Sequence, residues 1–321
     1  MSNSNVTSLT ESQHAELYLA VDQALADINQ VILGKERVIK LAVACLLAKG
    51  HLLIEDLPGM GKTTLSHSLA SVLGLDFARI QFTSDLLPAD ILGSAVYNRE
   101  SSRFDFHPGP IFNQLLLADE VNRATPKTQS ALLEAMAEYQ VTIEGETRPL
   151  PEPFFVIATQ NPSHQIGTFP LPESQLDRFL MKLELGYPDV ADEKRLLSGD
   201  DRKAVINSLE PRMTTQELSA CQAAVDKVTI SETLLDYLLA LLVASRESDF
   251  CEHGLSPRAG LALQRAAKAW AFLEHRNYCI PEDVQAVFHG VVEHRIGGTG
   301  KAQLNANNVT EQLLKSVSVP V

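Results

Sequence analysis

Residues 52–64, LLIEDLPGMGKTT, limit the possible fold more than any other part of the chain. They predict a short buried strand, a glycine-rich turn and a helix that begins near Lys62. Backbone N–H groups around Gly59 and Gly61 can converge at the helix N-terminus, where the helix dipole favours an anion. The pattern therefore predicts a phosphate-binding turn, in which Lys62 reaches the β and γ phosphates and the Thr63 hydroxyl binds Mg²⁺.

The match to the pattern G-x-x-x-x-G-K-[ST] is incomplete, because Asp56 stands at the position of the first glycine. An incomplete match also occurs in a plain strand, turn and helix that bind no ligand. The remainder of the chain has to distinguish these two interpretations.

The composition is that of an ordinary globular protein, and 321 residues are enough for two domains. The formal net charge of −13 argues against a surface dedicated to nucleic acid or to an anionic membrane, although a local basic groove stays possible. The 4 cysteines form no C-x-x-C pair and indicate reduced thiols rather than a metal site. Because the chain has neither an apolar signal segment nor an apolar run of membrane length, we expect a cytoplasmic protein without membrane insertion.

Five short apolar segments alternate with helical patterns, and each predicts a strand. They are residues 51–55, 77–83, 115–118, 154–159 and 181–185. Four of them are nearly continuous apolar runs, which are typical of a parallel sheet that helices cover on both faces. Functional groups in such α/β sheets gather at the carboxyl ends of the strands.

Two of these strands end in residue types that phosphate hydrolysis requires. Asp119 can help to hold Mg²⁺, and Glu120 is placed to orient and deprotonate an attacking water. Asn161 follows the strand 154–159 and can hydrogen-bond the same water or the γ phosphate. A buried strand followed by two acids is often only a solvated strand end, but this order behind one phosphate turn favours a hydrolase.

Two arginines extend this candidate site. Arg178 lies in LPESQLDRFL, and Arg258 follows Ser256 and Pro257, which predict the start of a helix. Arginine suits a phosphoryl transition state because its planar, permanently charged fork neutralises two oxygens. Each arginine taken alone could equally be a surface ion-pair partner.

The regions around the strands predict the domain organisation. Residues 1–9 are expected to be a disordered tail, and residues 10–188 an α/β core that carries two β-hairpins, at 91–106 and 140–150. Residues 189–321 show helical spacing and predict an all-α, lid-like domain. Before the phosphate turn, the segment Val31, Ile32, Leu33 and Gly34 could close over a purine ring or could belong to a plain core helix.

With these residues in view, the chain resembles the MoxR family of AAA+ ATPases. The stretches that carry the resemblance are IEDLPGMGKT, FHPGPIFNQLLLADEVNRATPKTQSALLEAMAE, QVTIEGETRPLPEPFFVIATQNP, GTFPLPESQLDRF and LSPRA. They cover most of residues 50–185 and the start of one helix beyond. The resemblance implies a P-loop AAA+ core with a parallel five-stranded sheet and a C-terminal helical lid domain.

The resemblance also implies residue roles and cofactors, ATP and Mg²⁺. Lys62 and Thr63 would belong to Walker A, together with Pro58, Gly59, Met60, Gly61 and Thr64, while Asp119 and Glu120 would form Walker B. Asn161 would be sensor 1, Arg258 sensor 2 and Arg178 an arginine finger that reaches a neighbouring subunit's nucleotide. Val31, Ile32, Leu33 and Gly34 would line the adenine. Members typically form hexameric rings and act as chaperone-like motors on protein clients, often ones with von Willebrand factor A domains.

Three functions follow from these observations. An ATP-driven machine that remodels or matures a protein client is the first. A DNA motor is the second, although the acidic balance and the lack of a winged-helix or zinc module argue against it. A nucleotide-dependent switch that acts by binding alone is the third, but no N-K-x-D guanine signature is present and Glu120 beside Asp119 favours hydrolysis.

Overall fold

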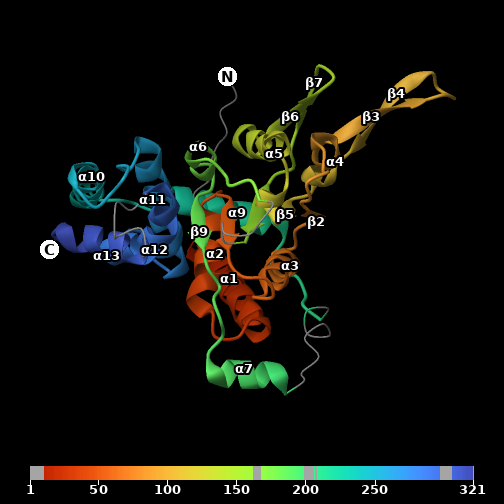
Figure 1. Ribbon diagram of the computed structural model, residues 1–321. Coiled ribbons are helices and arrows are strands. Elements are labelled where there is room, and N and C mark those ends of the chain that lie inside the picture. The colour runs from red at the N-terminus through yellow and green to blue at the C-terminus, as the bar shows by residue number, and fades with distance from the viewer. Residues whose placement is uncertain (1–10, 162–167, 199–205, 207, 297–305, 321) are drawn as a thin grey trace, which may run out of the picture.

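The computed structural model describes residues 11–161, 168–198, 206, 208–296 and 306–320. Its centre is a five-stranded sheet in the order β2-β5-β8-β1-β9 (Figure 1), and all four pairings are parallel. The strands are β1 (Leu52–Glu55), β2 (Phe77–Gln81), β5 (Leu115–Asp119), β8 (Phe155–Gln160) and β9 (Met181–Leu183). The parallel five-stranded sheet expected from the sequence is confirmed. The expected tail at residues 1–9 lies outside the described residues.

The central strands of the sheet are buried on both faces because their apolar side chains alternate between two hydrophobic clusters, whereas the edge strand β2 is only partly buried. Leu52 and Ile54 pack in one cluster with helices α1 (Glu11–Val31), α2 (Glu36–Leu47) and α3 (Lys62–Val72). Leu53 points to the other face, into the cluster that holds α4 (Pro88–Leu92), the short helix η1 (Pro110–Phe112) and α5 (Pro126–Glu138). This two-sided burial explains why these strands read as continuous apolar runs in the sequence.

The residue that ends α2 in a left-handed conformation is not a glycine. Lys49 adopts the left-handed backbone conformation instead, with φ of 55°. Gly50 serves close packing, since a Cβ atom there would come within 2.2 Å of the Leu180 side chain. The helix that leads to β1 is thereby held directly against the segment before β9.

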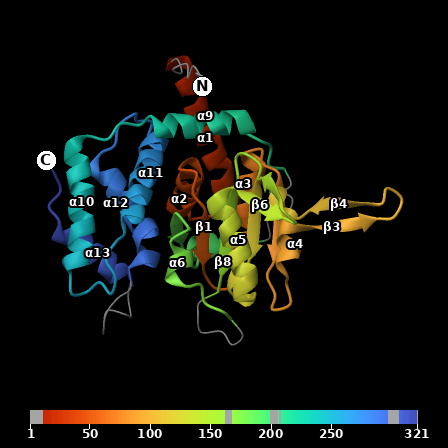
Figure 2. The ribbon, with the colours of Figure 1, turned by 90° about the horizontal axis from the view of Figure 1, so that it is seen from above.

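Both expected hairpins are present. Strands β3 (Gly93–Asn98) and β4 (Arg103–Pro108) form the first, which projects from the body of the molecule in Figure 2. Strands β6 (Gln140–Ile143) and β7 (Glu146–Pro149) form the second, which turns at Glu144 and Gly145. The two hairpins touch, because the Arg148 guanidinium lies 4.1 Å from the centre of the Phe106 ring.

The chain after β9 is helical, as expected. Its helices are α7 (Val190–Leu197), α9 (Thr215–Asp226), α10 (Glu232–Glu247), α11 (Pro257–Leu273), α12 (Pro281–Val292) and α13 (Ala306–Ser316), and the 3₁₀ helix η3 (Glu293–Arg295) follows α12. Ser231 and Ser256 cap α10 and α11 by accepting a hydrogen bond from the backbone three residues on. Helix α7 lies apart from α10 to α13, below the core in Figure 1. Among the described residues, no helix is long and apolar enough to cross a membrane.

Candidate functional site

The turn after β1 forms one wall of an open cavity of about 380 Å³ at the carboxyl ends of the strands. We call residues 56–61 the phosphate loop. Gly59 and Gly61 have φ of 86° and 88°, a left-handed conformation that favours glycine. A Cβ atom at either position would meet no described atom within 4 Å, so the space in front of the loop is open. The loop therefore offers a concavity at the N-terminus of α3.

The cavity gathers most of the residues expected to form the site. Its lining contains Pro58, Gly59, Gly61, Lys62, Thr63, Thr64, Asp119, Glu120 and Asn161, together with Arg79 and Gln81. Met60, which was also expected here, packs on the hydrophobic core instead. The strand order explains the gathering, because β1, β5 and β8 are neighbours and end at the same edge of the sheet.

Lys62 is held at the base of the cavity. Its Nζ atom donates to the backbone oxygen of Asp56 at 2.7 Å and to Oδ1 of Asn161 at 3.3 Å. Burial lowers the pKa of Lys62, although the carboxylates of Asp56, Asp119 and Glu120 oppose this effect. An amine held in this way is directed at the open space in front of the loop, where a polyanion would stabilise its charged form.

Asp119 is buried and fixed from two sides. Its Oδ1 atom accepts a hydrogen bond from the Thr159 hydroxyl at 2.6 Å. Its Oδ2 atom accepts from Arg79, at 2.6 Å from Nη2 and 3.2 Å from Nε. The carboxylate that was expected to help hold Mg²⁺ is thus paired with an arginine in this structure.

Glu120 adopts a left-handed conformation with φ of 56°, which costs about 1–3 kcal/mol for a residue other than glycine. Its carboxylate accepts hydrogen bonds from Gln81 at 2.8 Å, from Arg123 at 2.7 Å and from Asn161 at 3.1 Å. Its backbone N–H donates to the Thr159 hydroxyl at 2.8 Å. These contacts keep the carboxylate at the edge of the cavity.

The sequence analysis did not identify Arg79, Gln81 or Arg123. Arg79 and Gln81 are two residues apart on β2 and therefore share one face, and β2 pairs with β5 so that Gln81 lies opposite Asp119. Polar side chains at the carboxyl end of a third strand were the signal that could have found them. No local pattern distinguishes Arg123.

The two predicted arginines do not lie in this cavity. Arg178 and Arg258 line a separate cavity of about 190 Å³, together with Arg265, Arg295 and Asp177. Arg178 Nη1 donates to the backbone oxygen of Leu133 at 2.6 Å, and Arg258 Nη1 lies 3.9 Å from Oδ2 of Asp177. Four guanidinium groups around one carboxylate give this second cavity an excess of positive charge, which suits an anion.

The segment expected to line the adenine is not among the residues that line the first cavity. Val31 and Ile32 are buried in the core. Gly34, with φ of 67°, faces α7, since a Cβ atom there would come within 2.2 Å of the Asp192 carboxylate. The segment therefore meets the chain that follows β9.

The described residues include no group of three or more histidine, cysteine, aspartate or glutamate side chains that could enclose a metal ion. Thr63 and Asp119 line the same cavity as the phosphate loop. One hydroxyl and one carboxylate are the protein ligands typical of Mg²⁺ that is shared with substrate phosphates and water. These residues fit magnesium that arrives with a nucleotide rather than a resident metal centre.

Comparisons with known proteins agree with this geometry. Residues 51–181 match the family described as "ATPase family associated with various cellular activities (AAA)", and residues 243–316 match the "AAA lid domain". The chain is 43% identical over 309 residues to the Uncharacterized protein YeaC of Bacillus subtilis, which covers 95% of this chain and 97% of that protein. It is 36% identical over 323 residues to the Chaperone MoxR1 of Mycobacterium tuberculosis, covering 97% of this chain and 85% of that protein. A crystal structure of a "putative ATPase" from Cytophaga hutchinsonii has a TM-score of 0.87 at 37% identity and covers 97% of this chain and 98% of that one.

Proposed function

Because the chain belongs to the MoxR family of AAA+ ATPases, with a P-loop core and a C-terminal helical lid, we propose that it hydrolyses ATP to ADP and phosphate at the cavity of the phosphate loop. The observation that carries the proposal is the position of Asn161. Its side chain contacts both Lys62 and Glu120, so the phosphate-binding lysine and the candidate base lie on either side of one amide. A γ phosphate and its attacking water would fit between these groups.

Each residue then has a defined role. The amides near Gly59 and Gly61 bind the β phosphate, and Lys62 neutralises charge on the β and γ phosphates. Glu120 orients and deprotonates water, and Asn161 positions that water without adding charge. Thr63 and Asp119 would hold Mg²⁺, which when bound neutralises the developing phosphate charge.

Arg178 and Arg258 act on a neighbouring subunit in this proposal. Both lie in the second cavity, which shares no described lining residue with the first. A single subunit therefore holds the phosphate loop in one place and its two candidate transition-state arginines in another. A homo-oligomeric ring, with six subunits as the family resemblance suggests, would join the second cavity of one subunit to the nucleotide of the next by a repeated head-to-tail contact.

The position of the adenine and the domain boundary complete the ATP-binding proposal. The segment from Val31 to Gly34 meets the connection between β9 and α7, and Lys35 Nζ donates to the backbone oxygen of Tyr187 at 2.6 Å. We place the adenine between these two segments. The connection also separates the proposed core, residues 10–188, from the proposed lid, residues 189–321.

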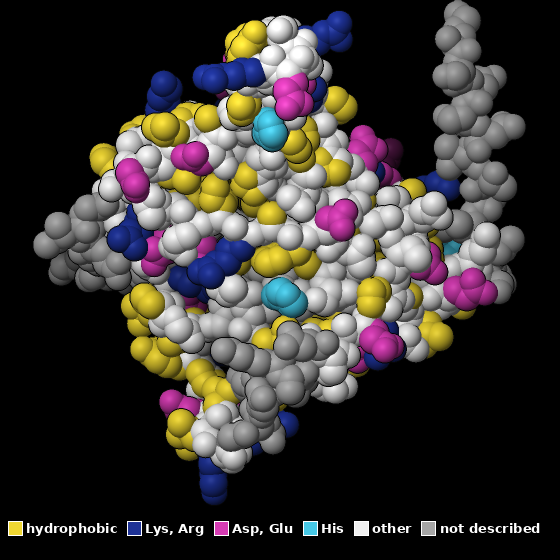
Figure 3. All heavy atoms as spheres, turned by 90° about the vertical axis from the view of Figure 1, so that its right-hand side faces the viewer, with side chains coloured by type: hydrophobic (Ala, Val, Ile, Leu, Met, Phe, Trp, Pro, Cys, Tyr) yellow, Lys and Arg dark blue, Asp and Glu magenta, His cyan; other side chains and the backbone are white. Residues whose placement is uncertain are grey.

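The client is proposed to be a protein, in keeping with the name Chaperone MoxR1 of the relative. The projecting hairpin carries Val96, Tyr97 and Phe104, which are 49%, 52% and 65% exposed. On the face seen in Figure 3, hydrophobic, acidic and basic side chains are interspersed, and Lys and Arg form no continuous stripe. This mixture suits a polypeptide, for which a von Willebrand factor A domain is one candidate, better than a DNA backbone.

Phosphate release from ATP and from GTP tests the activity directly. Purified protein with Mg²⁺ should release phosphate from ATP in preference to GTP. Lys62→Ala protein should release phosphate from neither nucleotide and should not retain ATP. Wild-type protein that neither binds ATP nor releases phosphate from it would refute the assignment. A pull-down with Glu120→Gln protein in ATP then identifies the client, because a variant that binds ATP without hydrolysing it should retain the client.

A further inference from the structure

A partly buried lysine connects the helical lid to the strand before the phosphate loop. Lys182 lies on β9, and its Nζ atom is 3.3 Å from Oε2 of Glu55 and 3.2 Å from Oε1 of Glu293. Glu55 is the last residue of β1, directly before the loop, whereas Glu293 begins η3 at the end of α12. One ammonium group therefore joins the nucleotide-binding strand to the lid.

The three side chains are shielded from solvent. They are 13% exposed for Lys182, 24% for Glu55 and 10% for Glu293. Burial alone would lower the pKa of Lys182, but the two carboxylates outweigh burial and raise it. The lysine is thus charged, and its removal would leave two carboxylates facing each other with little water.

The contact continues into the catalytic site. Gln160 donates from Nε2 to the same Oε2 atom of Glu55 that Lys182 contacts, and Asn161 is the next residue in the chain. A shift of Glu55 would therefore move both the start of the phosphate loop and the residue that precedes the water-positioning amide.

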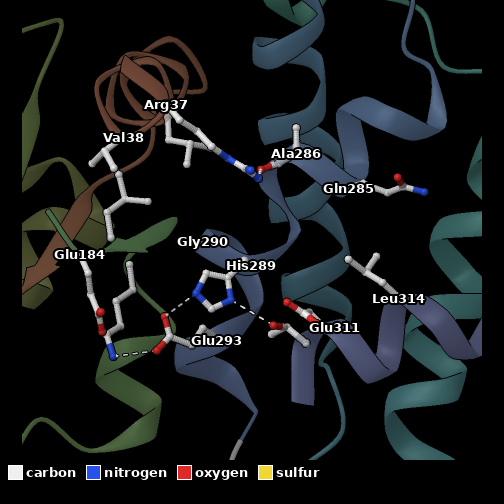
Figure 4. Close-up of a pocket in the computed structure, with 14 residues that line it drawn as sticks. Arg37, Val38, Glu184, Gln285, Ala286, His289, Gly290, Glu293, Glu311 and Leu314 are labelled. Atoms are coloured by element: carbon white, nitrogen blue, oxygen red, sulfur yellow. Dashed lines mark hydrogen bonds and ion pairs between the residues drawn. The ribbon is translucent and has the colours of Figure 1, made fainter. Parts of the chain in front are cut away.

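The Lys182–Glu293 pair borders a cavity. This cavity has a volume of about 440 Å³ and lies between α2, β9, α12 and α13 (Figure 4), and Lys182 and Glu293 are among its lining residues. Helix α12 also packs on β9 at the wall of this cavity, since a Cβ atom at Gly290 would lie 3.2 Å from the Leu183 side chain. Helix α12 thus packs on β9 and borders the cavity beside the ion pair.

We propose that Lys182 is a positioning residue that couples the lid helix α12 to the phosphate loop, so that ATP binding at the loop shifts or orders α12. The inference rests on the proposed ATPase function. It assigns to Lys182 no contact with ATP, because the residue acts through Glu55 and Gln160.

Hydrogen exchange with and without a non-hydrolysable ATP analogue and Mg²⁺ tests the coupling. In wild-type protein the analogue should slow exchange both in the phosphate loop and in peptides from α12. In Lys182→Met protein the loop should still be protected, whereas the response of α12 should be lost. ATP turnover should fall about fivefold or more with a smaller change in KM, which corresponds to about 1 kcal/mol of activation free energy.

Lys40→Met is the matched control, because Lys40 on α2 forms another lysine–glutamate pair between core and lid, 2.8 Å from Glu274, far along the chain from the loop. It should leave the response of α12 intact. Lys182→Arg, which keeps the charge, should restore most of that response, and Glu293→Gln should weaken it even if Lys182→Met does not fold.

An unchanged α12 response in Lys182→Met or Glu293→Gln, or an equal loss in Lys40→Met, would overturn the coupling while leaving the ATPase assignment intact. A wild-type loop that gains no protection from the analogue would instead overturn the proposed function, and the coupling with it.

Discussion

The carboxylate of Asp56 accepts a hydrogen bond from the backbone N–H of Gly186 at 2.7 Å. The same oxygen accepts from the N–H of Leu185 at 2.8 Å. Asp56 stands at the position of the first glycine in the phosphate-loop pattern, and here it accepts these two backbone hydrogen bonds. It fastens the chain that leaves β9 to the first residue of the loop.

Restoring the pattern glycine should therefore harm the protein. Asp56→Gly removes three hydrogen bonds to the carboxylate, from the N–H groups of Leu57, Leu185 and Gly186, and each such bond to a charged group contributes about 1.5–3 kcal/mol. We expect a lower Tm and a higher KM for ATP, measured by thermal unfolding and phosphate release. Asp56→Asn keeps one acceptor oxygen and should give an intermediate loss; a glycine variant with tighter ATP binding would contradict this role.

Replacing Glu120 with glutamine should separate binding from turnover. Glutamine keeps the size of the side chain but cannot take a proton from water, so the hydrolysis rate should fall about 10²- to 10⁴-fold. ATP affinity, measured with a fluorescent analogue, should change little, in contrast to Lys62→Ala. Equal hydrolysis rates in wild type and Glu120→Gln would show that another group is the base.

Mixing two inactive variants tests whether Arg178 acts between subunits. Arg178→Ala should fold and bind ATP but hydrolyse little, and Lys62→Ala should lack a working nucleotide site. In mixed rings an intact site can face an intact arginine, so a 1:1 mixture should recover up to about a quarter of wild-type activity. Full activity of Arg178→Ala alone would exclude the residue from catalysis.

Two substitutions on helix α11 test whether Arg258 takes part in hydrolysis. Arg258→Ala should lower turnover, because its guanidinium faces the second cavity. Lys268→Ala, on the same helix α11, removes a lysine that donates to the backbone oxygen of Asp226 and should leave turnover unchanged. Similar losses in both variants would indicate damage to the lid rather than a role in catalysis.

Acid should destabilise the fold through His51. This residue is buried, accepts a hydrogen bond from the Val156 N–H at 3.1 Å and lies 3.1 Å from the backbone oxygen of Met136. Burial lowers its pKa from 6.5 to about 4. The unfolded chain takes up a proton near pH 6.5 and the native protein does not until about pH 4, so the stability is present above pH 6.5 and is lost as the pH falls toward 4.

The expected loss from His51 is on the order of 3 kcal/mol across that range. Denaturant unfolding at several pH values measures it. His51→Gln should flatten the dependence, whereas His253→Gln, at an exposed histidine, should not. An equally steep dependence in His51→Gln would assign the effect to other groups, among them the buried His294, whose pKa is also well below its ordinary value.

The sequence predicted the features that depend on residues close together in the chain. Short apolar segments predicted the five strands and the two-sided burial of the central ones, and the residues from Gly59 to Thr63 predicted a loop followed by a helix. Asp119, Glu120 and Asn161 could be expected to meet because parallel strands end at one edge of the sheet. These predictions depend on short-range periodicity and on a general rule of α/β sheets.

Only the tertiary structure decided which distant side chains meet. Arg79 pairs with Asp119 because β2 lies beside β5 in a particular register, and neither the order nor the register can be read from one strand. Likewise, Arg178 and Arg258 share a cavity away from the loop only because of how α11 packs on the core. Local sequence fixes the conformation of a segment, but the contacts between segments depend on the packing of the whole chain.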